Sequence, residues 1–202
     1  EDVGIEVKIF PNAQVVGSDR DSIEAVTLGE IDMTSVAELQ FAPNIKEFYV
    51  FNADYLFDDL KDAKAKLDGE QGDLLKKAAD DKNMGAKVAA FFGSSGRIFW
   101  NNVREVNTLA DFQGIKSRAP ENPINIAELE ALGCIPTPMA WNELYTGLQQ
   151  GTVDGLVSSK MPIIQQGLID VLKYATDTNH SYSINVILIS SAKYNSFSEE
   201  QA

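Results

Sequence analysis

The feature that most constrains the fold is a short pattern that occurs twice along the 202 residues. The first copy has a strand-like segment at residues 3–10, a Pro-containing turn, a helix-like segment, then Gly29-Glu30-Ile31-Asp32 and a new strand. The second copy begins at Cys134 and repeats this order up to Gly151-Thr152-Val153-Asp154 and another strand. The glycine suits a left-handed helix end, and the aspartate can accept backbone hydrogen bonds in the turn. The repeat predicts two α/β lobes of similar build, and the alternative is a chance likeness of two ordinary βαβ turns.

Strand and helix signals alternate along the chain without a low-complexity linker. Ser18 and Asp21 have the spacing of a helix N-terminal cap, ahead of the first helix. A second helical region is expected over residues 58–82, with a break near residues 69–72. The mostly apolar run at residues 86–92 predicts a buried strand. This alternation is typical of α/β proteins whose sheets carry helices on both faces.

Residues 114–120 are predicted to form a short buried strand that delivers one arginine to a turn. Thr108 and Asp111 have the spacing of a capping pair for a short helix before this strand. Pro120 disfavours a helical conformation at the preceding residue and ends the strand. We therefore expect Arg118 at the C-terminal edge of a sheet, where open α/β folds bind ligands. Its planar guanidinium matches a carboxylate or phosphate, and the alternative is an arginine in a structural ion pair.

Two lobes require segments of chain that cross between them. Residues 93–96, with the sequence Gly-Ser-Ser-Gly, are expected to form one flexible crossing, and residues 176–185 the return crossing. The predicted domain ranges are 1–94 plus 185–202 for lobe 1 and 95–184 for lobe 2. Arg97 lies just after the first crossing, so we expect it to face the same cleft as Arg118. Two arginines in one cleft would form a strong site for a monoanion.

The repeat also predicts which strand ends face each other across the cleft. Aligning Asp32 with Asp154 places residues 36–38 opposite residues 158–160, which are mostly small or polar in both copies. Glu38 is therefore a candidate acceptor for a ligand hydroxyl or amine. The alternative is a solvated glutamate on the surface.

Charge and composition exclude several classes of function. The chain has 30 acidic and 17 basic residues and a formal net charge of −13, so nucleic acids and anionic membrane surfaces are poor partners. No apolar run is long enough to span a bilayer, so direct membrane insertion is not expected. The single cysteine, Cys134, excludes an internal disulfide and a cysteine-based metal cluster. His180, the only histidine, excludes a two-histidine metal site or a His-based triad, and is expected to be a structural donor near the hinge. We therefore predict no enzymatic activity, catalytic residue, cofactor or metal.

A series of ordered motifs runs through almost the whole chain. In the second half they occupy residues 109–123, 131–133, 136–145, 148–155, 173–174 and 178–180, and in the first half residues 10–12, 28–33 and 55–57. Together these motifs resemble the solute-binding proteins of TRAP transporters, the DctP family.

The resemblance implies a type II periplasmic-binding-protein fold, with two α/β lobes, a hinge and a small organic acid held between them. It implies delivery of that acid to the membrane subunits of a TRAP transporter, by a monomer located in the periplasm. Family members usually carry a further strand and helix before Val3 and a helical segment after Ala202, so we expect both to be lacking here, together with a signal peptide. The alternative function is a ligand-sensing domain of a regulator or sensor that binds a small carboxylate.

The resemblance also assigns roles to individual residues. Arg118 matches the arginine that pairs with the substrate carboxylate, Arg97 matches a second arginine near it, and Trp141 matches an aromatic residue that packs against the ligand. After Gly155 the commoner family pattern is Gln-Glu-Asn-Pro, so Ser158 replaces an asparagine that often touches the ligand. A hydroxyl has shorter reach and one donor instead of two. The predicted ligand-binding set is Arg118, Arg97, Trp141, Ser158, Ser159 and Glu38.

Overall fold

The computed structural model describes residues 4–10, 14–199 and 201, and within them two β-sheets organise the chain. Sheet A has the order β1-β8-β2, and all its strands are antiparallel. Sheet B has the order β5-β4-β6-β3-β7, with β4 parallel to both β5 and β6. The strands are β1 (Met33–Ala37), β2 (Ala86–Gly96), β3 (Ile98–Asn101), β4 (Lys116–Ala119), β5 (Ile135–Pro138), β6 (Gly155–Ser158), β7 (Tyr174–Thr176) and β8 (Tyr182–Ser190).

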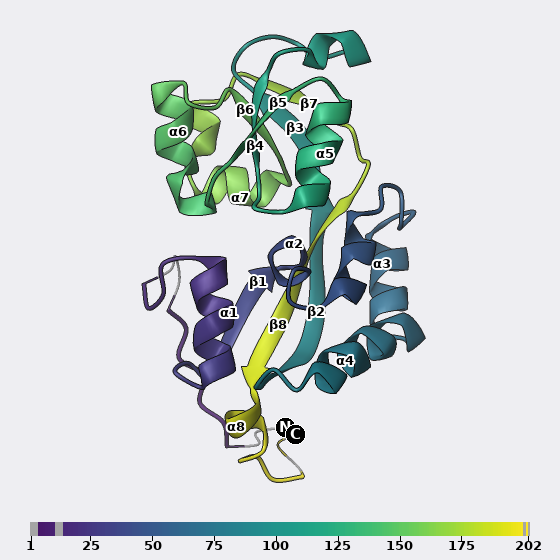
Figure 1. Cartoon of the computed structure of the whole chain (residues 1–202), viewed down its shortest axis with the longest axis vertical. Coiled ribbons are helices and arrows are strands. Elements are labelled where there is room, and N and C mark those ends of the chain that lie inside the picture. Colours follow the sequence, from purple (N-terminus) through teal and green to yellow (C-terminus); the bar gives the residue numbers. More distant parts are fainter. Residues whose placement is uncertain (1–3, 11–13, 200, 202) are drawn as a thin grey trace.

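Each sheet carries its own helices and forms one lobe (Figure 1). The sheet A lobe contains α1 (Asp19–Leu28), α2 (Glu38–Phe41), η1 (Lys46–Asn52), α3 (Leu60–Leu67), α4 (Glu70–Lys82) and α8 (Ser191–Tyr194). The sheet B lobe contains η2 (Leu109–Phe112), α5 (Pro123–Ala131), η3 (Trp141–Glu143), α6 (Leu144–Gln150), α7 (Lys160–Gln165) and η4 (Leu168–Asp170). The two-lobed α/β fold is therefore confirmed, whereas the exact domain ranges stay a prediction.

Alternation along the strands of sheet B explains how one sheet supports two cores. Ile98 and Trp100 of β3 belong to a buried cluster with Leu156, whereas Phe99 between them packs in a separate cluster with Ile115. Successive side chains of a strand point to opposite faces, so sheet B is covered on both sides. All four residues of β3 are buried for this reason.

Local signals in the sequence form as expected around both lobes. The Ser18 side chain accepts a hydrogen bond from the Asp21 backbone N–H and begins α1, which ends at Gly29 with φ of 76°. Thr108 and Asp111 form the expected capping box, although the helix they begin, η2, is a 3₁₀ helix. These elements depend on contacts within a few residues, which is why the sequence alone predicts them.

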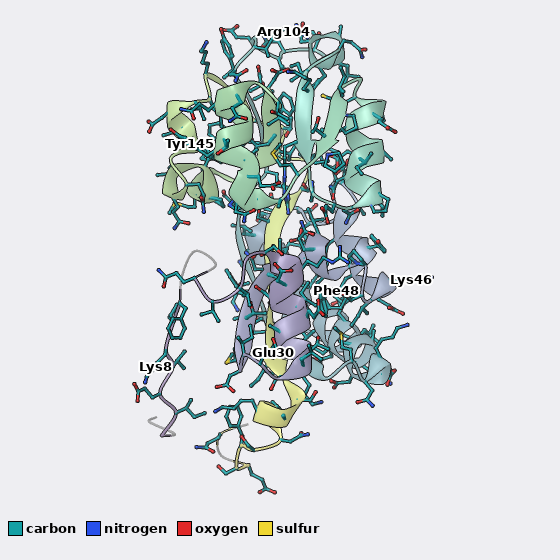
Figure 2. The ribbon with its side chains drawn as sticks, turned by 60° about the vertical axis from the view of Figure 1, so that its left-hand side comes forward. Lys8, Glu30, Lys46, Phe48, Arg104 and Tyr145 are labelled. Atoms are coloured by element: carbon teal, nitrogen blue, oxygen red, sulfur yellow. The ribbon has the colours of Figure 1, made fainter. Side chains whose placement is uncertain are left out.

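The predicted strand at residues 3–10 is wrong over residues 4–10, which are exposed and form no strand. Figure 2 shows Lys8 of this segment standing apart from the lobes. The alternation of apolar and polar residues suits a strand, but a strand also needs a neighbour to bond its backbone groups. In the described chain, β1 pairs only with β8. The turn expected at Pro11 lies outside the described residues, so only the second half of the repeated pattern occurs in both copies.

Two connections join the lobes. β2 runs into β3 through Arg97, and the chain returns from β7 to β8 through residues 177–181. Residues 93–96, expected to be a flexible crossing, form the last part of β2, where Gly93 and Gly96 pair with β8 on either side of a shift of register. A second shift lies between Val88 and Ala90, so the pairing of β2 with β8 is irregular at two places.

Gly85, between α4 and β2, provides a test of the packing in the sheet A lobe. It has φ of +87°, and an added Cβ would lie 2.4 Å from the Thr27 carbonyl oxygen. Gly29 has φ of +76° with nothing within 4 Å of the same position. We expect Gly85→Ala to lower the free energy of unfolding by about 3 kcal/mol, and Gly29→Ala by about 1 kcal/mol, in urea titrations. Equal losses would show that the Thr27 backbone moves aside.

Candidate functional site

A cavity lies between the two lobes and contains most of the titratable side chains of the junction. Its lining includes Arg97, Arg118 and Glu128 from the sheet B side, Asp54 from the sheet A side, and His180 from the β7–β8 connection. The cavity therefore brings together the two arginines that the sequence predicted, with acidic residues on its other walls.

Arg118 reaches the cavity from the C-terminal end of β4, as predicted. It is only 7% exposed, because β4 is paired on both sides and Arg118 lies opposite Thr137 and Leu156. Its Nε donates a 2.9 Å hydrogen bond to the Met139 carbonyl, and its guanidinium carbon lies 5.6 Å from the centre of the Trp141 ring. Within the described residues Arg118 forms no ion pair and no hydrogen bond from its Nη nitrogens is found. Arg118 therefore has no partner for a structural ion pair in the described part of the chain.

The surroundings of Arg118 disfavour its positive charge. Burial, and then repulsion from Arg97, lower the pKa of Arg118 from its usual value to about 10, and nearby Asp19 and Glu121 oppose this shift. The side chain stays cationic at neutral pH. Two positive groups at one cavity, one of them without an ion-pair partner in the described chain, form a site that an anion stabilises.

Arg97 joins the two lobes through an ion pair with Glu38. Its Nη2 lies 2.9 Å from Glu38 Oε1, and the side chains are 14% and 1% exposed. The interpretation of Glu38 as a solvated surface residue is therefore wrong. Burial raises the pKa of Glu38, while the charge of Arg97 opposes that rise. The second oxygen, Oε2, is buried and has no hydrogen-bond partner among the described residues.

The other predicted site residues lie at different depths. Trp141, at the start of η3, is half-buried and packs against the Arg118 guanidinium. Ser158 and Ser159 are 5% and 0% exposed, and neither lines the cavity. Their neighbour Val157 lines it instead, because adjacent residues of β6 point to opposite sides. The Ser158 carbonyl accepts a 3.0 Å bond from the Trp100 indole, which holds β6 against β3.

Polar contacts across the junction join the two lobes. Asn122 Nδ2 donates to the Leu39 carbonyl at 3.0 Å, and Asn142 Nδ2 donates to the Gly17 carbonyl at 3.0 Å. The Asn122 side chain also caps α5. With the Arg97–Glu38 pair, these contacts tie the strand ends of sheet B to α2 and the start of α1.

Several residues of the site were missed by the sequence interpretation. Asp19, at the first position of α1, has its pKa raised by burial, with a hydrogen bond from the Ala37 backbone and the charge of Arg118 acting against that rise. An acid in the first turn of a helix is common, so the sequence gave no reason to single it out. Asp54, Glu128 and His180 come from three separate elements and meet only through the tertiary fold.

Among the described residues, no helix is long and apolar enough to cross a bilayer.

Comparison with known proteins adds family relationships to this geometry. The family model described as "Bacterial extracellular solute-binding protein, family 7", DctP, matches residues 3–202. The chain is 36% identical over 189 residues to a solute-binding protein of Verminephrobacter eiseniae, covering 94% of this chain and 56% of the relative. It is 32% identical to the 2,3-diketo-L-gulonate-binding periplasmic protein YiaO of Escherichia coli, covering 97% of this chain and 59% of that protein. The chain thus spans little more than half the length of these relatives.

Solved structures show the same fold. The sugar acid binding protein DctPAm from Advenella mimigardefordensis, in complex with galactonate, superposes with a TM-score of 0.91 at 31% identity, covering 97% of this chain and 62% of that one. A TRAP periplasmic solute-binding protein from Sulfurospirillum deleyianum with bound succinate gives a TM-score of 0.89 at 25% identity, covering 97% and 62%.

The Arg97–Glu38 pair can be tested by a double-mutant cycle. Removing Glu38 leaves Arg97 mostly buried without its partner, so we expect Glu38→Ala to reduce the free energy of unfolding by about 3 kcal/mol. The double variant with Arg97→Ala should lose less than the sum of the single losses. As a control, the exposed Lys77–Asp81 pair, with side chains 69% and 66% exposed, should show a coupling of no more than about 0.5 kcal/mol. Additive losses at Glu38 and Arg97, measured by urea unfolding, would contradict this account.

Proposed function

The chain belongs to the DctP family of TRAP-type solute-binding proteins, a non-enzymatic transport family, and from that premise we propose that it captures a small organic acid between its lobes. It then delivers the acid to the membrane subunits of a TRAP transporter. The observation that carries the proposal is Arg118, which is buried at the cavity without an ion-pair partner among the described residues.

The contacts of Arg118 favour a carboxylate as the bound group. The Met139 carbonyl accepts the hydrogen bond from Nε, and the guanidinium carbon lies over the Trp141 ring. The Nη nitrogens are therefore the atoms available to a ligand. A carboxylate can accept two parallel hydrogen bonds from such a group. Its negative charge also relieves the repulsion between Arg118 and Arg97 that lowers the pKa of Arg118.

The acidic residues around the cavity favour an acid with one carboxylate and several hydroxyl groups. Glu38 does not line the cavity, but its partner Arg97 does, and a ligand hydroxyl group that reaches the buried Oε2 of Glu38 can satisfy it. Asp54 and Glu128 line the cavity and repel a second carboxylate. Solved relatives include proteins in complex with galactonate and with D-erythronate, both of which are polyhydroxy monocarboxylates. We therefore assign the ligand to the sugar acids.

Trp141 and the two serines have different parts in this proposal. Trp141 does not line the cavity and acts by orienting Arg118, so it contacts only the part of the ligand that binds next to that guanidinium. Ser158 and Ser159 are buried, do not line the cavity and support the end of β6. They contact the ligand only after the two lobes move relative to each other.

Capture requires that the lobes open and close. In the proposal, lobe 1 (1–94 plus 185–202) and lobe 2 (95–184) rotate about the crossings near residues 93–96 and 176–185. Only contacts that are better in the closed form can drive closure. The bond from Asn122 to the Leu39 carbonyl and the Arg97–Glu38 pair are of this kind, because each joins the two lobes. The protein acts as a periplasmic monomer, and its closed form docks on the transporter.

The proposal predicts selective stabilisation by sugar acids. A ligand at a hundred times its dissociation constant adds about 2.7 kcal/mol to the free energy of unfolding, which raises the melting temperature by about 5–10 °C for a chain of this size. We expect sugar acids to produce this shift in a thermal-shift screen that also contains dicarboxylates and neutral sugars. The shift should disappear in Arg118→Ala and be reduced in Arg118→Lys, which keeps the charge but loses the two-point contact.

Arg104→Ala provides the matched control. Arg104 is an exposed arginine of the same lobe, at the end away from the junction (Figure 2). Its loss should leave the ligand-induced shift unchanged. Equal stabilisation of the parent and Arg118→Ala would show that Arg118 is structural. A shift produced by neutral sugars and not by acids would overturn the assignment of ligand class.

A further inference from the structure

Three side chains that do not bind the carboxylate of the acid in the proposed function converge on one point of the junction. Asp54 follows η1 in the sheet A lobe, Glu128 lies on α5 in the sheet B lobe, and His180 lies in the connection from β7 to β8. One potential ligand atom from each lies within 4.8 Å of the other two. His180 Nε2 and Glu128 Oε1 are 3.4 Å apart.

Hydrogen bonds around the cluster fix which atoms face its centre. Thr178 Oγ1 donates to the Arg97 carbonyl at 3.4 Å and lies 2.8 Å from His180 Nδ1. The neutral ring has two tautomers, and in the one whose Nδ1 donates to Thr178, the Thr178 proton is on the Arg97 carbonyl and Nε2 presents a lone pair toward Glu128. Asn125 Nδ2 donates to Glu128 Oε2 at 3.2 Å, which leaves Oε1 directed at the imidazole. In this tautomer the lone pair of His180 Nε2 and the carboxylates of Glu128 and Asp54 face one point, where a cation can bind all three.

We propose that Asp54, Glu128 and His180 form a site for a divalent transition metal ion of the Zn²⁺ type, which bridges the two lobes. Ligand atoms about 2.0–2.2 Å from a tetrahedral Zn²⁺ lie about 3.3–3.5 Å from each other. The 3.4 Å between His180 Nε2 and Glu128 Oε1 agrees with that spacing. Asp54 is exposed, so its side chain can rotate to bring a carboxylate oxygen to the same spacing from the other two ligand atoms. An imidazole with two carboxylates suits Zn²⁺, whereas Ca²⁺ and Mg²⁺ favour oxygen ligands alone.

The outer contacts of the site also have the form found around bound zinc. Metal-binding histidines donate their second ring N–H to a neighbouring acceptor, and metal-binding carboxylates are themselves hydrogen-bonded. Thr178 and Asn125 fill these two roles. The two carboxylates offset the charge of the ion, and nearby Arg97 is paired with Glu38. His180 is the only histidine of the chain, so the sequence gave no metal-binding pattern.

A metal ion at this place stabilises the closed arrangement, because its ligands come from both lobes and from the connection between them. By linkage, an ion that binds the closed form better promotes capture of the acid, and the acid promotes binding of the ion to the same extent. This coupling rests on the proposed function. The metal site itself does not, and it is measured with no acid present.

The first test uses the protein without substitutions. After treatment with a chelator, it is titrated with ZnCl₂ in a calorimeter, and the ring nitrogens of ¹⁵N-histidine are followed by NMR. We expect one Zn²⁺ per chain and a large shift of the Nε2 resonance, with a smaller change at Nδ1. Because the chain has one histidine, this signal reports on His180 alone. Binding of Zn²⁺ without a change in that resonance places the ion elsewhere on the acidic surface and overturns the proposal.

Variants on one helix supply the matched comparison. Glu128→Gln removes a proposed ligand, whereas Glu130→Gln removes an exposed carboxylate of α5 two residues away. We expect the affinity for Zn²⁺ to fall by a factor of about 100 in Glu128→Gln and in His180→Gln, and to stay unchanged in Glu130→Gln. Equal affinity in all three variants contradicts the site. Far-UV circular dichroism checks that each variant is folded, and the NMR titration of the parent protein decides the question if one is not.

Discussion

The structure depends on positive charge that is buried where the two lobes meet. A buried guanidinium loses its hydration, and only hydrogen bonds and opposite charge compensate for that loss. Arg97 is compensated by Glu38 across the junction, so its charge holds the lobes together. Arg118 has the Met139 carbonyl and the face of Trp141, which orient it without neutralising it in the described chain. One arginine therefore closes the junction and the other leaves it ready for an anion.

The sequence predicted the fold wherever the decisive contacts are local. Helix caps at Ser18 and Thr108 depend on partners three residues away, and Pro120 alone ends β4, so Arg118 could be placed at a sheet edge. Residues 4–10 show the limit of this approach. They have the alternation of a strand, but whether a strand forms depends on a neighbouring segment, and that is a property of the whole fold.

The candidate site shows the same difference between residues placed by local contacts and residues placed by the whole fold. Arg97 was predicted at the cleft because it follows the first crossing, and Arg118 because it lies at the C-terminal edge of a short strand, and the cavity does contain both. Ser158 was expected at the cavity, yet Val157 lines it, since a difference of one residue along a strand changes the face. Asp54, Glu128 and His180 are each more than about fifty residues from the other two in the sequence, and no local pattern predicts that they meet. Only the three-dimensional structure shows that these side chains lie close together.

The two ends of the cavity have opposite charge, and this arrangement links the ligand class to the metal site. A carboxylate at Arg118 places the remainder of the ligand toward walls that include Asp54, Glu128 and His180. Without a cation, two carboxylates there repel a second acid group and accept hydrogen bonds from hydroxyl groups, which favours a sugar acid. A divalent cation at the proposed site would neutralise the two carboxylates and remove this repulsion, and its open coordination position would bind a second carboxylate or adjacent hydroxyl groups. Under this proposal, the occupancy of the metal site would decide between two classes of acid without any change in the arginines.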